Sequence, residues 1–188
     1  MQDRGSYLTG QFLIAMPALA DPNFAQTVTY ICQHNEEGAL GIVISRPMEM
    51  RLVEILSTME IDISREGMDE IPVYFGGPVQ PERGFVLHAP AGDWQGTLVI
   101  NESIGLTTSR DILEAIAAGE GPEKFLVALG YAGWGSGQLE QEMLDNAWLN
   151  VPADPEILFE TPPSQRWKAA AARLGVNLDL LSSQAGHG

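Results

Sequence analysis

Short apolar, β-branched runs bounded by Pro, Asp, Asn or Gly fill the first part of the chain. They predict strands over residues 12–16, 27–32 and 39–45. The polar segment 34–38 joins the second run to the third and ends in Gly38, a residue type that tolerates a positive φ. The second and third strands are therefore expected to form a β-hairpin.

Helical spacing of apolar residues appears in four later segments. The stripe of the first segment consists of Leu52, Val53, Ile55, Leu56 and Met59. The second helix is expected to begin with a capping box at Thr108 and Asp111 and to end before Gly119. A third helix is predicted over 138–149, with the stripe Leu139, Met143, Leu144, Ala147 and Trp148. The fourth begins at 161–163 and ends at Gly175.

Three further strands are predicted at residues 73–75, 84–88 and 97–101, and the polar stretch 61–71 is expected to be a loop. The continuous apolar run 125–131 is typical of a strand buried on both faces, which places it centrally in the sheet. Because the strands come in groups, the expected fold is α+β, of a layered α/β type. We predict a single domain over residues 1–188, with a mixed, largely antiparallel sheet flanked by about four helices.

The net charge of the chain disfavours some classes of binding partner. The chain has 188 residues, of which 25 are acidic and 10 basic, giving a formal net charge of -15. No Lys or Arg lies between Lys124 and Arg166. Nucleic-acid phosphates would be repelled over most of the surface, so direct nucleic-acid binding is not expected.

The single cysteine, Cys32, rules out an intramolecular disulfide and indicates a cytoplasmic protein. No apolar run approaches the roughly 18–20 residues of a transmembrane helix, so no membrane association is expected. Residues 12–20 after Arg4 imitate a signal peptide, but Asp3 and Pro17 favour a strand that ends at the proline.

The glycine-rich turn 133–138 precedes a predicted helix, where backbone N–H groups can hold an anion. It lacks the Lys-Ser/Thr pair of a phosphate loop, and close packing of Trp134 explains its glycines better. Gly76 and Gly77 present the same two alternatives. Cys32 and His34 fall on one face of a regular strand, as a nucleophile pair or two metal ligands would. A metal needs more ligands, so no metal site is predicted.

At these motifs the chain resembles the AlgH/YqgE family of bacterial proteins. The resemblance rests on segments 10–17, 21–24, 41–47, 76–79, 130–140 and 148–149. Ser45 departs from the Asn that usually precedes Arg-Pro in the family. The resemblance implies a compact α/β-type fold with a mixed sheet, a cytoplasmic location, and no established catalytic residue or cofactor. The family's name is linked to transcriptional regulation of alginate production, and the acidic charge favours an indirect route for any such role.

The leading hypothesis is a non-catalytic binding or regulatory domain that acts through a small ligand or a partner protein. Its predicted ligand-binding surface consists of Asp21, Phe24, Arg46, Gly76, Gly77, Tyr131, Trp134 and Gln138. The alternative is an enzyme of unrecognised class in which Asp21, His34, Arg46 or Gln138 supplies acid–base or oxyanion-stabilising groups. No cofactor is predicted, no catalytic residue is assigned, and the oligomeric state stays open.

Overall fold

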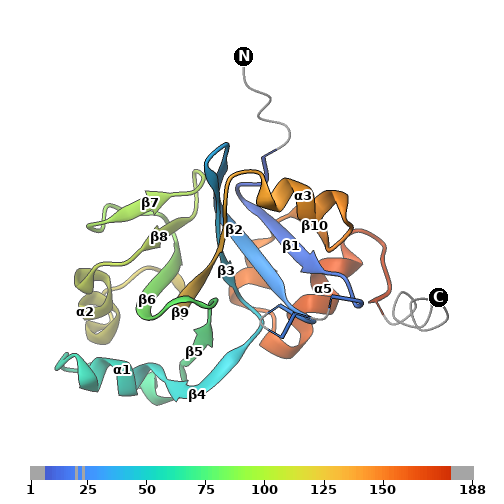
Figure 1. Cartoon of the computed structure of the whole chain (residues 1–188). Coiled ribbons are helices and arrows are strands. Elements are labelled where there is room, and N and C mark those ends of the chain that lie inside the picture. Colours follow the sequence, from blue (N-terminus) through green and yellow to red (C-terminus); the bar gives the residue numbers. More distant parts are fainter. Residues whose placement is uncertain (1–6, 20, 23, 179–188) are drawn as a thin grey trace.

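The computed structural model describes residues 7–19, 21–22 and 24–178. These residues form an α+β fold with one curled ten-stranded sheet and helices on both of its faces (Figure 1). In chain order the elements, with 3₁₀ helices marked η, are β1 (Gln11–Ala15), β2 (Val28–Asn35), β3 (Gly38–Val43), β4 (Pro47–Arg51), α1 (Leu52–Thr58), η2 (Met68–Glu70), β5 (Pro72–Phe75), β6 (Val79–Ala89), β7 (Thr97–Val99), β8 (Gly105–Thr107), α2 (Arg110–Ala118), β9 (Lys124–Trp134), α3 (Gln138–Leu144), β10 (Trp148–Pro152), α4 (Pro155–Phe159), η3 (Pro163–Gln165) and α5 (Arg166–Ala172).

The sheet has the strand order β10-β1-β2-β3-β9-β6-β8-β7, and β5 lies beside β9 and pairs with β4. All these pairings are antiparallel except that of β5 with β9, which is parallel. The predicted mixed, largely antiparallel sheet and the hairpin of β2 and β3 are confirmed. The predicted central strand is confirmed as β9, which pairs with β3, β5 and β6.

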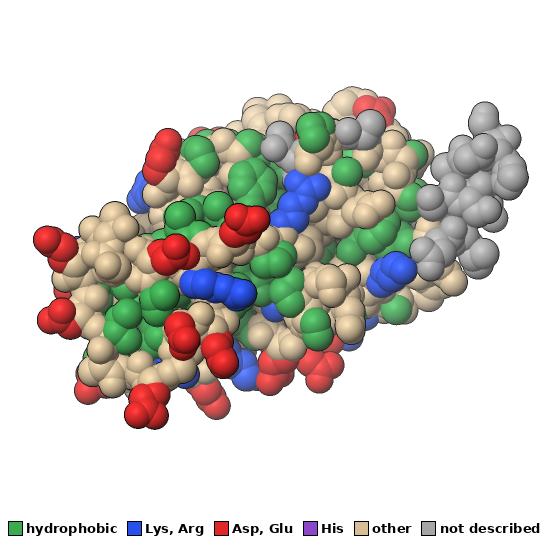
Figure 2. All heavy atoms as spheres, turned by 90° about the horizontal axis from the view of Figure 1, so that it is seen from below, with side chains coloured by type: hydrophobic (Ala, Val, Ile, Leu, Met, Phe, Trp, Pro, Cys, Tyr) green, Lys and Arg blue, Asp and Glu red, His purple; other side chains and the backbone are tan. Residues whose placement is uncertain are grey.

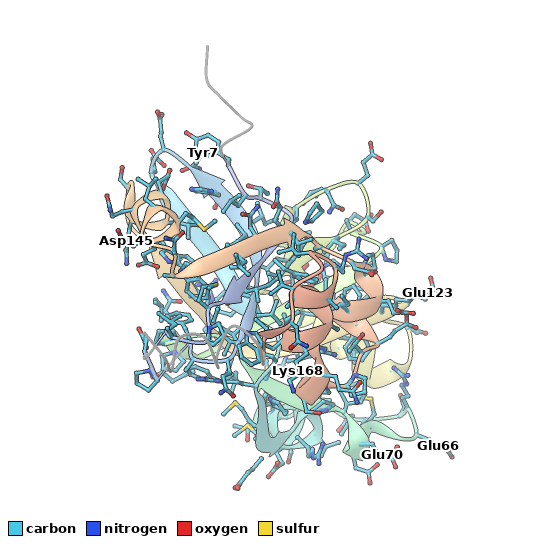
Figure 3. All side chains as sticks on the ribbon, turned by 90° about the vertical axis from the view of Figure 1, so that its right-hand side faces the viewer. Tyr7, Glu66, Glu70, Glu123, Asp145 and Lys168 are labelled. Atoms are coloured by element: carbon cyan, nitrogen blue, oxygen red, sulfur yellow. The ribbon has the colours of Figure 1, made fainter. Side chains whose placement is uncertain are left out.

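One face of the sheet carries a continuous core under α4 and α5. Figure 3 shows α5 in front of the sheet, with Lys168 on it. Arg166 anchors this helix, because its buried guanidinium donates to the carbonyl oxygens of Thr161 and Ile44 and lies over the Tyr74 ring. The opposite face carries two separate clusters, one under α1 and α2 and one beneath α3.

The helix predicted over 138–149 is wrong in its second half. Helix α3 ends at Leu144, whose side chain is 76% exposed, and Asn146 adopts a positive φ of 60°. Trp148 instead begins β10, which pairs with β1 along the sheet edge. Both periodicities bury Trp148, and the backbone partner offered by β1 decides between them.

Several other boundaries differ from the predictions. Strands β4, β8 and β10 were missed, and β6 begins at Val79, five residues before the strand predicted over 84–88. Ser109 is the N-cap residue of α2, and its hydroxyl donates to Asp111, so the capping box expected at Thr108 is corrected. The last predicted helix is divided into η3 and the shorter α5, and the predicted loop 61–71 contains η2.

Within the described part of the chain, no helix is long and apolar enough to cross a membrane. Across the same residues, no group of three or more His, Cys, Asp or Glu side chains is placed to hold a metal ion.

Candidate functional site

A cleft of about 670 Å³ lies between α1 and α2, above strands β6, β8 and β9. Its volume falls within the range of small-molecule sites, roughly 300–1,000 Å³. Its lining residues are Met50, Glu54, Ile55, Thr58, Met59, Glu82, Gly84, Val86, Thr107, Thr108, Ser109, Arg110, Leu113, Val127 and Leu129. Figure 2 views the molecule from the side on which α1 lies and shows hydrophobic patches bordered by Asp and Glu side chains.

The apolar floor of the cleft comes from two paired strands. Val86 of β6 and Val127 of β9 are cross-strand partners, and Gly84 is the partner of Leu129. A Cβ atom added at Gly84 would meet no atom within 4 Å, because the missing side chain leaves open space between the helices. A glycine at this one strand position therefore keeps the floor uncovered.

Hydroxyl groups line the end of the cleft near the start of α2, and most are bonded within the protein. Ser109 Oγ, which is bonded to Asp111, also lies 2.6 Å from the carbonyl oxygen of Gln95. Thr108 accepts from Arg83, whose guanidinium also lies 5.6 Å from the Phe85 ring centroid. On α1, Thr58 donates to the carbonyl oxygen of Glu54.

Thr107 belongs to a buried polar network behind the floor. Its Oγ lies 2.6 Å from His88 Nε2 and 2.7 Å from the Thr97 Oγ. His88 Nδ1 lies 2.9 Å from the Pro90 carbonyl oxygen, which fixes the proton on Nδ1. Burial lowers the pKa of His88 below its usual 6.5. Thr107 and His88 are fully buried, so this nucleophile-and-base-like pair ties β6, β7 and β8 together, and of the two only Thr107 is a lining residue of the cleft.

Three of the residues predicted for the ligand-binding surface, Phe24, Trp134 and Gln138, meet in one cluster around Glu142. Phe24 packs against Trp134 and Trp148, with ring centroids 6.1 and 5.5 Å away. Glu142 accepts hydrogen bonds from both indole nitrogens, at 3.0 and 2.9 Å, and from Gln138. We call Phe24, Trp134, Trp148 and Glu142 the tryptophan cluster.

Asp21 and Arg46 hold the loop that brings Phe24 to this cluster. The Asp21 carbonyl oxygen accepts from the backbone N–H groups of Phe24 and Ala25. Arg46 donates to the carbonyl oxygens of Pro22 and Ala25, both at 2.7 Å. Arg46, which was predicted to belong to the ligand-binding surface, thus orders a loop within the chain.

Gly76 and Gly77 follow β5 and lie against the backbone of β9 at Gly130 and Tyr131. A Cβ at Gly77 would lie 2.1 Å from the Tyr131 backbone carbon, and one at Gly76 would lie 2.4 Å from the Gly130 carbonyl oxygen. These glycines allow two backbones to touch. Tyr131 and Trp134 also line a shallow recess of about 410 Å³ beside the β2–β3 hairpin. None of the eight predicted surface residues lines the α1–α2 cleft, and ligand binding at them stays a prediction.

Cys32 and His34 contact different parts of the molecule. An irregular register between Ile31 and Gln33 interrupts the strand alternation. Cys32 lies in the main core, where burial raises the pKa of its thiol. His34 accepts from the backbone N–H of Leu8, and its Nε2 lies 3.3 Å from Glu140. The pair imagined from the sequence is not formed.

The residues of the cleft were not identified from the sequence. The one local signal was Gly84, the glycine that begins the predicted strand 84–88, since a glycine in a strand marks a bulge or a close approach of another group. The remaining lining residues read as ordinary core and helix positions, because a cleft is formed by side chains that do not meet.

Fold and cleft together define the class: an α+β protein with a curled mixed sheet and an apolar cleft under two short helices. A family model described as AlgH-like matches residues 12–179. The chain is 59% identical to a UPF0301 protein of Methylococcus capsulatus, covering 100% of both. It is 57% identical to AlgH of Pseudomonas aeruginosa, over 99% of this chain and 98% of that protein. The chain belongs to the AlgH-like family, which confirms the resemblance.

Two solved structures share the fold. The solution structure of AlgH from Pseudomonas aeruginosa, 57% identical, matches with a TM-score of 0.81 over 100% of both chains. A crystal structure of a protein from Corynebacterium diphtheriae, 20% identical, matches with a TM-score of 0.76 over 96% of this chain and 94% of that one. The second likeness concerns the fold alone.

Proposed function

We propose that this protein is a non-catalytic, regulatory ligand-binding domain that holds a small, largely apolar molecule in the α1–α2 cleft. The observation that carries the proposal is the open floor at Gly84, flanked by Val86, Val127 and Leu129. Water in contact with this apolar floor is displaced when an apolar ligand binds, which favours binding.

In this proposal the protein acts in the cytoplasm and passes the bound state of the cleft to a partner protein. The formal net charge of -15 supports a protein partner over nucleic acid, because DNA phosphates would be repelled. Helix α1 is the element suited to carry the signal, since Glu54, Ile55 and Thr58 line the cleft on one side and the helix follows the short edge strand β4.

The enzyme hypothesis has less support. His34 and Gln138 are each bonded to protein groups, and Arg46 is bonded to two carbonyl oxygens. Along the described chain these groups lie outside the α1–α2 cleft. General acid–base chemistry needs two such groups within reach of one substrate position.

The test uses methyl NMR of methionine-labelled protein titrated with octan-1-ol. Met50 and Met59 line the cleft, whereas Met143 packs in the cluster beneath α3. Saturable shifts are expected at Met50 and Met59 and not at Met143. Native mass spectrometry of freshly isolated protein, compared with the denatured sample, then identifies a natural ligand by an extra mass that denaturation removes.

Gly84→Leu is the blocking variant, because its side chain occupies the floor without meeting an atom near its Cβ. It should abolish the methionine shifts while the protein stays folded, and Gly84→Ala should weaken them only partly. Gly135→Leu is the matched control, since a Cβ there meets only the Gln138 side chain, at 3.9 Å. Wild-type protein without saturable shifts, or Gly84→Leu with unchanged shifts, contradicts the proposal.

A further inference from the structure

The charged groups of the α1–α2 cleft are unequal in sign. Two carboxylates, Glu54 and Glu82, and one guanidinium, Arg110, line it. Arg110 is already paired, because its Nε lies 3.2 Å from Glu114 Oε2 on the next turn of α2. The cleft therefore offers a ligand more negative than positive charge.

Glu82 makes no ion pair and no side-chain hydrogen bond with any described residue. Its neighbour Arg83 does not neutralise it, because that guanidinium bonds Gln80 and Thr108 and lies over Phe85. Phe85 belongs to the core on the opposite face of the sheet from Val86. A carboxylate without a partner thus stands beside an apolar floor.

The neutral polar groups of the cleft strengthen the same bias. The hydroxyl protons of Thr58 and Ser109 are donated to oxygens of the protein, and Thr107 is bonded to His88 and Thr97. The Glu54 and Glu82 carboxylates can only accept hydrogen bonds at neutral pH. The cleft therefore presents two carboxylates as acceptors, and the side-chain donors left to it are the Thr108 hydroxyl and the other N–H groups of Arg110.

We propose that the ligand of the α1–α2 cleft is a cationic amphiphile, an apolar body that carries a primary ammonium or a guanidinium group. This inference rests on the proposed function and names the chemical class of its ligand. An ammonium supplies donors and no acceptor, so it complements the lining, and its bonds to a carboxylate are charge-assisted. A ligand carboxylate would instead face Glu54 and Glu82.

The experiment compares three probes of one chain length at neutral pH: octylamine, octan-1-ol and octanoate. Affinities come from the methyl shifts of Met50 and Met59. Octylamine should bind about three- to tenfold more tightly than octan-1-ol, and octanoate more weakly than both. Added salt should reduce the amine preference and leave the alcohol affinity nearly unchanged.

Glu82→Gln tests which group selects the charge. It should bring octylamine affinity close to that of octan-1-ol without changing octan-1-ol affinity. Glu123→Gln is the matched control: it removes the same charge from an exposed residue outside the cleft, labelled in Figure 3, and should leave the amine preference intact.

The outcomes separate the two proposals. Equal affinity for octylamine and octan-1-ol, or tighter binding of octanoate, overturns the cationic ligand and leaves cleft binding standing. An amine preference that survives Glu82→Gln overturns Glu82 as the group that selects the charge. Failure of all three probes to shift Met50 and Met59 overturns the proposed function and this inference with it.

Discussion

The two ends of strand β9 differ in how other side chains cover them. Near its end, Trp134 is enclosed by Phe24 and Trp148, and Glu142 satisfies both indole nitrogens. Earlier in the same strand, Val127 and Leu129 form the floor of the α1–α2 cleft. The aromatic, glycine-rich end is filled, and the plain aliphatic end is open. In this chain the aromatic and glycine-rich motifs therefore mark close packing, whereas a strand position without a side chain, Gly84, marks the space for a ligand.

Trp134→Ala should produce the largest effect on this comparison. The indole is 6% exposed and contacts two other aromatic rings, so its removal leaves a cavity. We expect a loss of about 3–5 kcal/mol in the free energy of unfolding, measured by urea denaturation. Trp134→Phe should lose less. A loss below about 1 kcal/mol for Trp134→Ala would show that this end is not tightly packed.

Glu142→Ala should come next, because it removes the shared acceptor of two buried indole N–H groups. Leaving these donors without a partner should cost about 2–3 kcal/mol in urea denaturation. Glu142→Gln keeps an acceptor oxygen and serves as the control, with a smaller loss. Equal stability of Glu142→Ala and wild type would mean that water replaces the carboxylate at no cost.

Leu129→Ala probes the open end of the same strand. Its side chain is half-buried and already faces the cleft, so truncation creates little new cavity. The expected loss is about 1 kcal/mol, clearly smaller than that of Trp134→Ala. Similar losses for the two variants would show that α1 and α2 close over the floor in solution, against the cleft described above.

The smallest effect at neutral pH concerns His88, behind the cleft. Burial lowers the pKa of His88 in the folded state below 6.5, so the unfolded chain binds this proton more readily. The histidine therefore contributes no pH dependence above about pH 7, and stability falls as pH drops below 6.5. Denaturation of wild type at pH 7.5 and 5.5 should show this decrease, and His88→Gln should show less of it. An identical pH slope in the variant would exclude His88 as the source.

The general plan of the sheet was predictable because its signals are local. The runs that became β1, β2 and β3 alternate with turn residues, and the continuous apolar run of β9 requires cover on both faces. The strand β10 was not predictable, because Trp148 satisfies a helical stripe as well as a strand and only the edge of β1 decides between them. The short β8 carries too few residues for a periodic signal.

The candidate site, like the sheet, was predictable in part from the sequence. The sequence pointed to Arg46, Gly77 and Trp134 as unusual, and each has a demanding structural role: tying a loop, allowing two backbones to touch, and filling a core. It was silent about the cleft, whose residues are individually ordinary. A cleft depends on distances between segments far apart in the chain, here α1, β6 and α2, and no local pattern encodes those distances.

The amino-acid sequence by itself determined the fold class, the central strand and the acidic character that disfavours nucleic acid, because these follow from periodicity and summed charge. Tertiary structure alone decided that the two tryptophans share the Glu142 carboxylate as an acceptor, that Cys32 and His34 lie in different parts of the core, and that the space above Gly84 is open. The physical reason is that packing and its gaps are properties of pairs of surfaces, which come together only when the chain has folded.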